Sequence, residues 1–252
     1  MSKKKILFYD IETTPLQAWV WKCGKQVVRH NQLVTGRDIY DVICITYCWN
    51  DNKKAKALNW GYTEQNSSQM IAQFDELIKS ADITIGKNSD RFDVKHINTR
   101  RLLSGLPGMP DWTRYTDDLE KQMRKYFYLP SYSLDYFSKI LGLGGKVKME
   151  FDDWINIVTK HPELGLKAFN KMIGYGKKDV EDTRAMWNHC AAHVEPKFKE
   201  LESCKHCGGL DFYKNGTRMS GRMLYQRFDC KKCGSYVGRA LIKSSGNLGI
   251  LS

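Results

Sequence analysis

Apolar and polar residues alternate with two different periods along this chain of 252 residues. Short runs rich in β-branched and aromatic residues predict strands. These runs cover residues 3–9, 42–49, 56–60 and 82–86. Elsewhere apolar residues recur every three or four positions, which predicts helices. The predicted helices cover residues 68–80, 92–103, 117–127, 134–141, 152–160 and 163 to about 194. Strands early and helices later predict an α/β domain with a mixed β-sheet flanked by helices.

The expected helix ends follow from capping residues and glycines. Thr116 or Asp117 is expected to cap the helix 117–127, and Ser133 the helix 134–141. The last long helix is expected to be disturbed near Gly174 and Gly176. After it the chain becomes rich in cysteine, glycine and basic residues. We therefore expect two domains, residues 1–197 and residues 198–252.

The net charge of +12 is unevenly distributed. Residues 201–252 hold nine Lys/Arg and three Asp/Glu, a net +6, while the first 200 residues hold 31 and 25, also +6. A basic excess favours a polyanionic partner such as nucleic acid, although it can also serve solubility alone. No apolar stretch approaches the ~18 residues of a membrane span. Acidic residues interrupt the only run that imitates a signal peptide, so we expect an intracellular, cytoplasmic protein.

The first predicted strand leads into two carboxylates, Asp10 and Glu12, separated by one residue. In a strand, residues i and i+2 point to the same face, so the two charges lie close together. Such a pair needs a cation or a proton between its members, unless it is simply a solvated strand end. Two more acidic positions complete the pattern. Asp93 follows the fourth strand in the stretch NSDRFD, and Tyr175 lies four residues before Asp179 on one helix face.

The order D-x-E, N-x-x-x-F-D and Y-x-x-x-D resembles the DEDDy branch of the DnaQ-like 3′–5′ exonucleases, which have a ribonuclease H-like fold. More narrowly, the layout resembles small phage-encoded exonucleases with a C-terminal zinc ribbon. The resemblance covers essentially the whole chain, although residues 14–41 match nothing in it. It implies a nuclease domain followed by a zinc ribbon, with a phage origin and, if the protein is phage-encoded, a location in the cytoplasm of the host cell.

The resemblance also implies roles for individual residues. Asp10, Glu12 and Asp179 would hold the metal that carries the attacking water. Asp10 and Asp93 would contact a second metal near the leaving oxygen. Tyr175 would orient the water. Independently of the family, hard Mg²⁺ or Mn²⁺ prefers oxygen ligands, and two such ions about 3.5–4 Å apart stabilise both oxygens of a phosphodiester cleavage.

Several neighbouring acidic residues compete with these assignments. Asp182 lies close to Asp179 on the same helix and is the alternative last ligand. Asp90, Asp117 and Asp118 are expected to be surface or capping residues. Asn88 is expected to fix a turn or to touch the substrate rather than to bind metal.

Four of the eight cysteines form two C-x-x-C-G knuckles, Cys204 with Cys207 and Cys230 with Cys233. Four thiolates at this spacing predict one structural Zn²⁺ in a zinc ribbon. His206, inside the first knuckle, is expected to be a spectator. The metal should supply much of the folding free energy of so small a domain. The remaining cysteines are expected to be small core residues. They are Cys23, Cys44, Cys48 and Cys190.

Basic and aromatic residues are interleaved in the predicted ribbon, a pattern that suits single-stranded nucleic acid. The basic ones are Arg218, Arg222, Arg227, Lys231, Lys232, Arg239 and Lys243, and the aromatic ones are Phe212, Tyr213, Tyr225, Phe228 and Tyr236. The alternatives are a small aromatic core with a solvated basic face, or a protein-docking surface. Candidate nucleic-acid contacts are Asn88, Arg218, Arg222, Arg227, Lys231 and Lys232.

Together these features predict a 3′–5′ exonuclease that needs two Mg²⁺ or Mn²⁺ and releases nucleoside 5′-monophosphates from single-stranded ends. DNA is favoured over RNA by resemblance only, and a replication or repair protein is a further candidate partner. Two alternatives stay open. One is a nucleic-acid-binding ribbon protein whose exonuclease fold is vestigial, and the other is a structure-specific endonuclease on the same fold.

Overall fold

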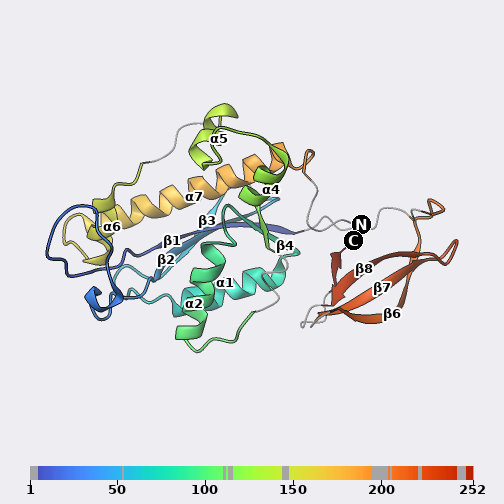
Figure 1. Ribbon diagram of the computed structural model, residues 1–252, viewed down its shortest axis with the longest axis horizontal. Helices are drawn as coiled ribbons and strands as arrows, with labels where there is room; N and C mark the ends of the chain where they lie inside the picture. Colours follow the sequence, from blue (N-terminus) through green and yellow to red (C-terminus); the bar gives the residue numbers. More distant parts are fainter. Residues whose placement is uncertain are drawn as a thin grey trace. The chain divides into compact units, whose positions relative to one another are not determined.

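A computed structural model of the chain describes residues 5–52, 54–109, 112, 116–143, 148–194, 204, 206–220, 223–242 and 248–251. The chain divides into two compact units, residues 1–193 and residues 194–252 (Figure 1). The predicted boundary after residue 197 falls within residues 195–203, which lie outside the described residues. No helix in the described part of the chain is long and apolar enough to cross a membrane.

The first unit is built on a mixed sheet, as predicted, and this sheet has five strands, one more than the sequence predicts. Its strands are β1 (Ile6–Thr13), β2 (Val42–Trp49), β3 (Lys56–Asn59), β4 (Ile83–Gly86) and β5 (Thr116–Asp118). In space their order is β3-β2-β1-β4-β5. The strands β1, β2 and β3 pair antiparallel, whereas β1, β4 and β5 run parallel. Strand β1 is therefore central and has a partner of each kind.

Helices cover both faces of this sheet. They are α1 (Ser68–Ser80), α2 (Asp93–Leu103), α4 (Leu119–Tyr126), α5 (Leu134–Ile140), α6 (Phe151–Val158) and α7 (Gly165–Cys190). Helices α1 and α2 lie on one side of the sheet, and α7 runs along the other (Figure 1). The sheet is thus flanked by helices, the arrangement that the sequence predicts.

Strand β1 divides its side chains between these two faces. Leu7, Tyr9 and Ile11 are buried in the main apolar cluster. There the ring of Tyr9 lies 5.5 Å from that of Phe74 in α1. Because strand side chains alternate, the even-numbered positions of β1 point to the opposite face, toward α7. The core on one face thereby directs the carboxylates to the other.

Two predicted boundaries differ from the structure. Strand β1 continues to Thr13, so Asp10 and Glu12 lie inside the strand and not beyond its end. This happens because β2 pairs with β1 along its whole length, through Thr13. The predicted caps Thr116 and Asp117 are wrong, since Asp118 caps α4 after the short strand β5. A strand of three residues carries too little periodicity to be detected in the sequence.

Helix α7 runs without a break from Gly165 to Cys190, so the expected disturbance at Gly174 and Gly176 is wrong. Tertiary contacts of α7 with β1 and β2 outweigh the weak helix propensity of glycine. The prediction of Ser133 as the cap of α5 is confirmed, because its hydroxyl accepts a hydrogen bond from the backbone N–H of Tyr136 at 3.2 Å.

The scattered cysteines behave as core residues with one exception. Cys44, Cys48 and Cys190 are buried. Cys23 is exposed, so that prediction is wrong. It lies in the long segment between β1 and β2, where residues 19–31 are all exposed.

The second unit is a four-stranded antiparallel sheet with the order β6-β7-β8-β9. Its strands are β6 (Phe212–Ser220), β7 (Met223–Cys230), β8 (Tyr236–Ile242) and β9 (Leu248–Leu251). Cys204 and Cys207 precede β6, Cys230 ends β7, and Cys233 lies in the turn before β8. The chain order therefore brings the two knuckles to the same end of the sheet.

Candidate functional site

Strand pairing places Asp10 and Glu12 on the face of the sheet that α7 covers. Asp10 pairs directly with Thr46 of β2, and paired residues share a face. The Thr46 hydroxyl donates a hydrogen bond to the backbone oxygen of Gly176 in α7 at 3.0 Å. Glu12 pairs with Cys44, whose thiol pKa is raised by burial and then by the charges of Glu12 and Asp10. Both carboxylates therefore lie beneath α7.

Tyr175 and Asp179 face these carboxylates from α7. The pKa of the Tyr175 phenol is raised well above its ordinary value of 10.0, first by burial and then by the charge of Asp179. The charges of Glu12 and Asp10 raise it further, and the phenol is hydrogen-bonded to Asp179. Asp179 itself is buried. The structure thus brings together Asp10, Glu12, Tyr175 and Asp179, from the first strand and the last long helix of the unit.

Gly176 permits this close approach of α7 to the sheet. A Cβ atom at this position would lie 2.8 Å from Cγ2 and 3.1 Å from Oγ1 of Thr46. Such distances are too short for normal packing, so only glycine fits here without displacement. By contrast, a Cβ atom at Gly174 would meet nothing within 4 Å. Gly176 therefore sets the distance between Tyr175 and the carboxylates of β1.

Asp93 reaches the same strand from the other side. Its Oδ1 accepts a hydrogen bond from the backbone N–H of Ile11 at 3.1 Å, between Asp10 and Glu12. Burial raises the pKa of Asp93 to about 7, against the lowering effect of backbone hydrogen bonds from Asp93 and Ile11. The charge of Asp118 raises this pKa further. Asp93 is thus a buried carboxyl that holds a proton near neutral pH and is fixed beside the pair on β1.

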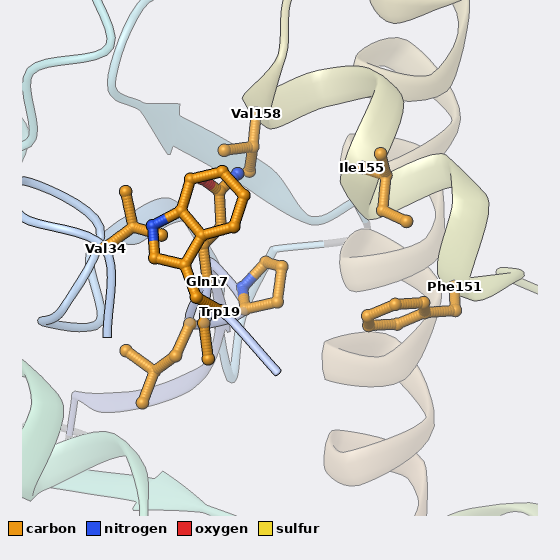
Figure 2. A pocket seen from close by; sticks show the side chains of 9 residues that line it. Gln17, Trp19, Val34, Phe151, Ile155 and Val158 are labelled. Atoms are coloured by element: carbon orange, nitrogen blue, oxygen red, sulfur yellow. The ribbon is translucent and has the colours of Figure 1, made fainter. Parts of the chain in front are cut away.

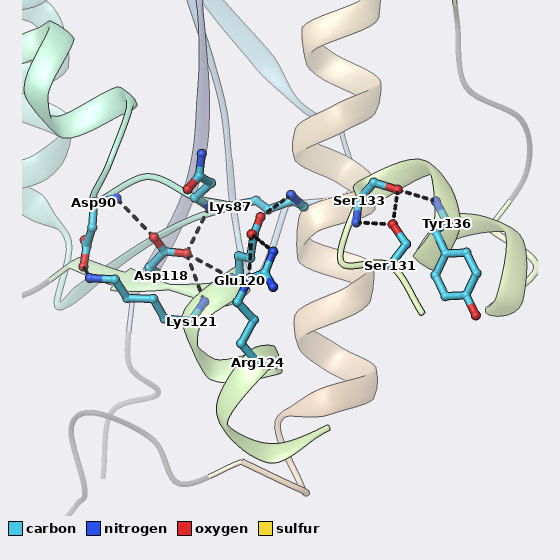
Figure 3. Close-up of polar contacts among 10 residues, drawn as sticks. Lys87, Asp90, Asp118, Glu120, Lys121, Arg124, Ser131, Ser133 and Tyr136 are labelled. Atoms are coloured by element: carbon cyan, nitrogen blue, oxygen red, sulfur yellow. Dashed lines mark hydrogen bonds and ion pairs between the residues drawn. The ribbon is translucent and has the colours of Figure 1, made fainter. Parts of the chain in front are cut away.

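Asp118 holds the loop that carries Asp93 (Figure 3). One of its oxygens accepts from the backbone N–H of Asn88 at 3.0 Å, and the other from that of Asp90 at 3.2 Å. It also accepts from the first backbone N–H groups of α4, at Glu120 and Lys121. A single buried carboxylate therefore joins the loop 88–93 to the start of α4.

Two ion pairs fasten the same loop to α4 (Figure 3). Lys87 pairs with Glu120 at 2.8 Å, and Asp90 pairs with Lys121 at 2.5 Å. Asn88 adopts a left-handed φ of 58°, and its backbone oxygen accepts from the N–H groups of Arg91 and Phe92. Asn88 therefore fixes the turn, one of the two roles that the sequence suggests for it.

The sequence predicts that Asp118 is a surface or capping residue, and it does not predict that Asp118 also holds the loop 88–93. The capping role is confirmed, but Asp118 is buried, with 3% of its surface exposed. Its contacts with residues 88 and 90 span about 30 positions in the chain. No local pattern in the sequence signals a contact over that distance.

Asp182, the competing candidate for the last metal ligand, is engaged elsewhere. One of its oxygens accepts from the hydroxyl of Ser138 in α5 at 3.2 Å, and the other forms an ion pair with Lys178. These partners lie on the side of α7 that faces α5. The phenol of Tyr175 is bonded to Asp179 instead. The geometry therefore favours Asp179 over Asp182 as the residue that faces β1.

Asp10, Glu12 and Asp179 lie on the α7 face of the sheet and Asp93 reaches β1 from the start of α2, but the four acidic side chains do not form a tight cluster. Among the residues that the structure describes, the only three or more Asp, Glu, His or Cys ligand atoms lying within 4.8 Å of one another belong to the four cysteines. Asp10, Glu12 and Asp179 would therefore have to close on a cation by side-chain rotation.

The four cysteines form a compact group that could hold a structural zinc ion. The sulfur of Cys204 lies 3.6 Å from that of Cys233, and the sulfur of Cys207 lies 3.6 Å from that of Cys230. A tetrahedron with Zn–S bonds of about 2.3 Å has S–S edges of about 3.8 Å. His206 is exposed and is not a member of the group.

Each knuckle closes in the same way around its glycine. Gly208 and Gly234 both have a φ of 71°, and their N–H groups bond the backbone oxygens of Cys204 and Cys230. Hydrogen bonds from the side chain and backbone of Ser235 lower the pKa of the Cys233 thiol. They therefore favour its thiolate, the form that binds zinc.

The candidate nucleic-acid contacts of the second unit are distributed over its surface. Arg218, Lys231 and Lys232 are exposed. Arg227 stacks on Tyr236 with its guanidinium carbon 5.3 Å from the ring centre. Arg222 lies outside the described residues. Tyr225 is buried, whereas Tyr213 and Tyr236 are exposed, so the aromatic residues are divided between a small core and the surface.

No protein-family model and no curated protein matches the chain. Among solved structures, the chain is similar to the family B DNA polymerase from the hyperthermophilic archaeon Pyrobaculum calidifontis, with 12% sequence identity and a TM-score of 0.49. The similarity covers 87% of this chain and 33% of that one, so the chain spans about a third of the length of the polymerase. This likeness is a structural observation only, and none of the functional proposals rests on it.

Proposed function

We propose that this protein is a divalent-metal-dependent 3′–5′ exonuclease of the ribonuclease H-like class that its motifs resemble. One observation carries the proposal: Tyr175 bonds Asp179 under the charges of Asp10 and Glu12, while Asp93 bonds the backbone between those two. Five residues that the DEDDy pattern requires, from three separate parts of the chain (β1, the start of α2, and α7), thus lie around one strand.

The donor set fits hard cations. All four acidic side chains offer oxygen, the ligand that Mg²⁺ and Mn²⁺ prefer. Buried Asp93 holds a proton up to a pKa of about 7, and such a carboxyl can exchange that proton for a metal ion. Bound between these carboxylates, two ions would stabilise the entering and departing oxygens of a phosphodiester and lower the pKa of a water.

The chain's own residues would position the reacting groups. Asp10, Glu12 and Asp179 would hold one ion, and Asp10 with Asp93 the other. The phenol of Tyr175 stays protonated at neutral pH because of its raised pKa. It therefore acts as a hydrogen-bonding group that orients the attacking water and not as a base. The contacts of Asp118 with loop 88–93 keep Asp93 at its place beside Ile11.

We propose that the second unit holds a structural zinc ion and contacts nucleic acid through its exposed basic residues. DNA is the favoured substrate by resemblance, and the products would be nucleoside 5′-monophosphates. Contacts to the 2′ position decide between DNA and RNA. The test therefore compares DNA and RNA substrates first.

The test uses matched single-stranded DNA and RNA oligonucleotides labelled at either end, incubated with Mg²⁺, Mn²⁺ or a chelator. We expect metal-dependent shortening from the 3′ end, which leaves a ladder with the 5′ label and releases the 3′ label at once. Asp10→Ala should lose activity by about 100-fold or more, because the site then lacks a shared ligand. Asp182→Asn is the matched control and should retain most activity. Full activity of the Asp10→Ala protein would discard the proposed site.

Tyr175→Phe separates positioning from binding. The phenylalanine keeps the ring but removes the hydroxyl, so turnover should fall about 10- to 100-fold while substrate affinity changes little. The reverse pattern, weak binding with normal turnover, would contradict the role of the hydroxyl. Cleavage of a circular single strand, which has no ends, would instead indicate an endonuclease. Oligonucleotide binding without cleavage under any metal would indicate a binding protein.

A further inference from the structure

The segment between β1 and β2 leaves the sheet beside the acidic site. It begins at Thr14, two residues after Glu12, and returns at Asp41. The two ends are joined by hydrogen bonds of 2.9 Å, from Thr14 N–H to the oxygen of Asp41 and from Asp41 N–H to the Thr14 hydroxyl. This segment has no counterpart in the motif pattern, and the proposed chemistry does not use it.

Together with α6 the segment lines an open cavity of about 380 Å³. Most of its lining is apolar, and the residues that line it are Pro15, Leu16, Gln17, Ala18, Trp19, Val34, Phe151, Ile155 and Val158. Trp19 and Val34 from the segment face Phe151 and Ile155 from α6 (Figure 2). The volume lies within the range of small-ligand sites, about 300–1,000 Å³.

The walls of the cavity are held by specific contacts. The backbone N–H of Trp19 donates to the oxygen of Gln32 at 2.8 Å, and Ala18 forms a bridge with Leu33. The guanidinium of Arg37 donates to the oxygen of Val158 at 3.3 Å, which joins the segment to the end of α6. The two elements that line the cavity, the segment and α6, are therefore joined by a hydrogen bond.

The segment that lines this cavity also carries cations and exposed indole rings. Between residues 15 and 37 the chain has four Lys/Arg and no Asp/Glu. Lys22, Lys25 and Arg29 are all exposed. Trp19 is 76% exposed and Trp21 is 99% exposed. Exposed tryptophans in the same segment as exposed cations suit a ligand with flat rings and negative charges, such as single-stranded nucleic acid.

The acidic residues of α6 lie on the other wall and limit where the negative charges can go. Asp153 is neutralised by Lys171 at 2.7 Å, whereas Asp152 is exposed. The phosphates of a bound nucleic-acid strand are therefore expected next to the segment, and its bases next to α6.

We infer that this cavity and the segment around it form a binding site for single-stranded nucleic acid. An unpaired base enters the cavity against Trp19 and Phe151, a neighbouring base stacks on Trp21, and Lys22, Lys25 and Arg29 contact phosphates. Gln17, which lines the cavity, can hydrogen-bond to the edge of the base. The inference deepens the proposed function, since it names a surface that would grip the substrate strand outside the acidic site.

The test measures binding of a 5′-fluorescein 20-nucleotide single strand to the full chain by fluorescence anisotropy, in chelator so that no cleavage occurs. The double variant Trp19→Ala/Trp21→Ala should bind at least about 10-fold more weakly, given the usual worth of base stacking. The conservative double variant Trp19→Phe/Trp21→Phe should recover most of the affinity. Tyr128→Ala, which removes a fully exposed ring elsewhere in the unit, is the control and should change nothing.

The basic residues give an independent readout. Removing three phosphate contacts in Lys22→Ala/Lys25→Ala/Arg29→Ala should reduce the slope of log K against log salt by about 2, since each contact to a single strand adds about 0.7. Unchanged affinity of the double tryptophan variant, or a surface that binds only polypeptide, would overturn the inference. Because the measurement needs no turnover, its failure is distinguishable from an absence of nuclease activity.

Discussion

Removing the charge of Asp93 should stabilise the metal-free protein, although it should harm the proposed activity. Asp93 is 2% exposed, and its pKa rises from an ordinary value of 3.8 to about 7. Between these values the folded protein keeps a proton that the unfolded chain has lost. The free energy of unfolding therefore falls as the pH rises through this window, and it is highest below about pH 4.

The magnitude follows from the width of the window. About three pH units at about 1.4 kcal/mol each give an upper limit of about 4 kcal/mol at pH 8. Water that enters around the ionised carboxylate recovers part of this energy, so we expect Asp93→Asn to be about 2 kcal/mol more stable than the parent at pH 8. At pH 4 the two proteins should be nearly equal, because the asparagine can still accept from the N–H of Ile11.

The assay is urea unfolding in chelator at pH 4, 6 and 8, followed by tryptophan fluorescence. All seven tryptophans lie within residues 1–193, so the signal reports on the first unit alone. Asp152→Asn, an exposed acid in α6, is the control for a general charge effect. Added Mn²⁺ should then stabilise the parent more than Asp93→Asn. An identical pH profile for the parent and Asp93→Asn would refute the reasoning.

Three further predictions concern packing and metal. Gly176→Ala should destabilise the first unit by about 1–3 kcal/mol in the same assay, because the new Cβ meets Thr46. Gly174→Ala is the control and should be neutral or stabilising by up to about 1 kcal/mol. Equal effects of the two substitutions would contradict the argument that Gly176 permits the close approach of α7 to the sheet. Cys230→Ser should abolish the binding of about one Zn²⁺ per chain, measured by metal analysis, without altering the tryptophan-detected transition. Arg101→Met should lower the free energy of unfolding by about 3–5 kcal/mol, since it leaves the buried partner Asp75 unpaired. Recovery of stability in the double variant with Asp75→Leu would support this cause. An unchanged free energy of unfolding in the single variant would refute it.

Much of the fold follows from the sequence because its elements have strong periods. Strand β2 and helix α1 have the predicted limits, since each is bounded by polar residues or turns. The three-residue strand β5 and the unbroken course of α7 were not predictable, because both depend on contacts between distant parts of the chain. The capping residue Asp118 shows the same limit, as its partners in the loop lie about 30 residues earlier.

The candidate site divides in a similar way. The sequence indicates Asp10, Glu12, Asp93 and Asp179 as a set only because their order and spacing resemble the motifs of a known family. The preference for Asp179 over Asp182 gains support only in three dimensions, from the partners of Asp182 in α5 and α7. The open cavity beside the segment 14–41 could not be predicted from the sequence, since the residues that line it lie more than 100 positions apart.

The placement of the acidic side chains on β1 and α7 has a consequence for the newly made protein. These are the first strand and the last long helix of their unit, so almost the whole unit must leave the ribosome before both can pack together. A nascent chain that has emerged only as far as α5 already contains Asp10, Glu12 and Asp93 but lacks their counterpart on α7. The arrangement of Asp10 and Glu12 opposite Tyr175 and Asp179 therefore cannot form until synthesis of the unit is nearly complete.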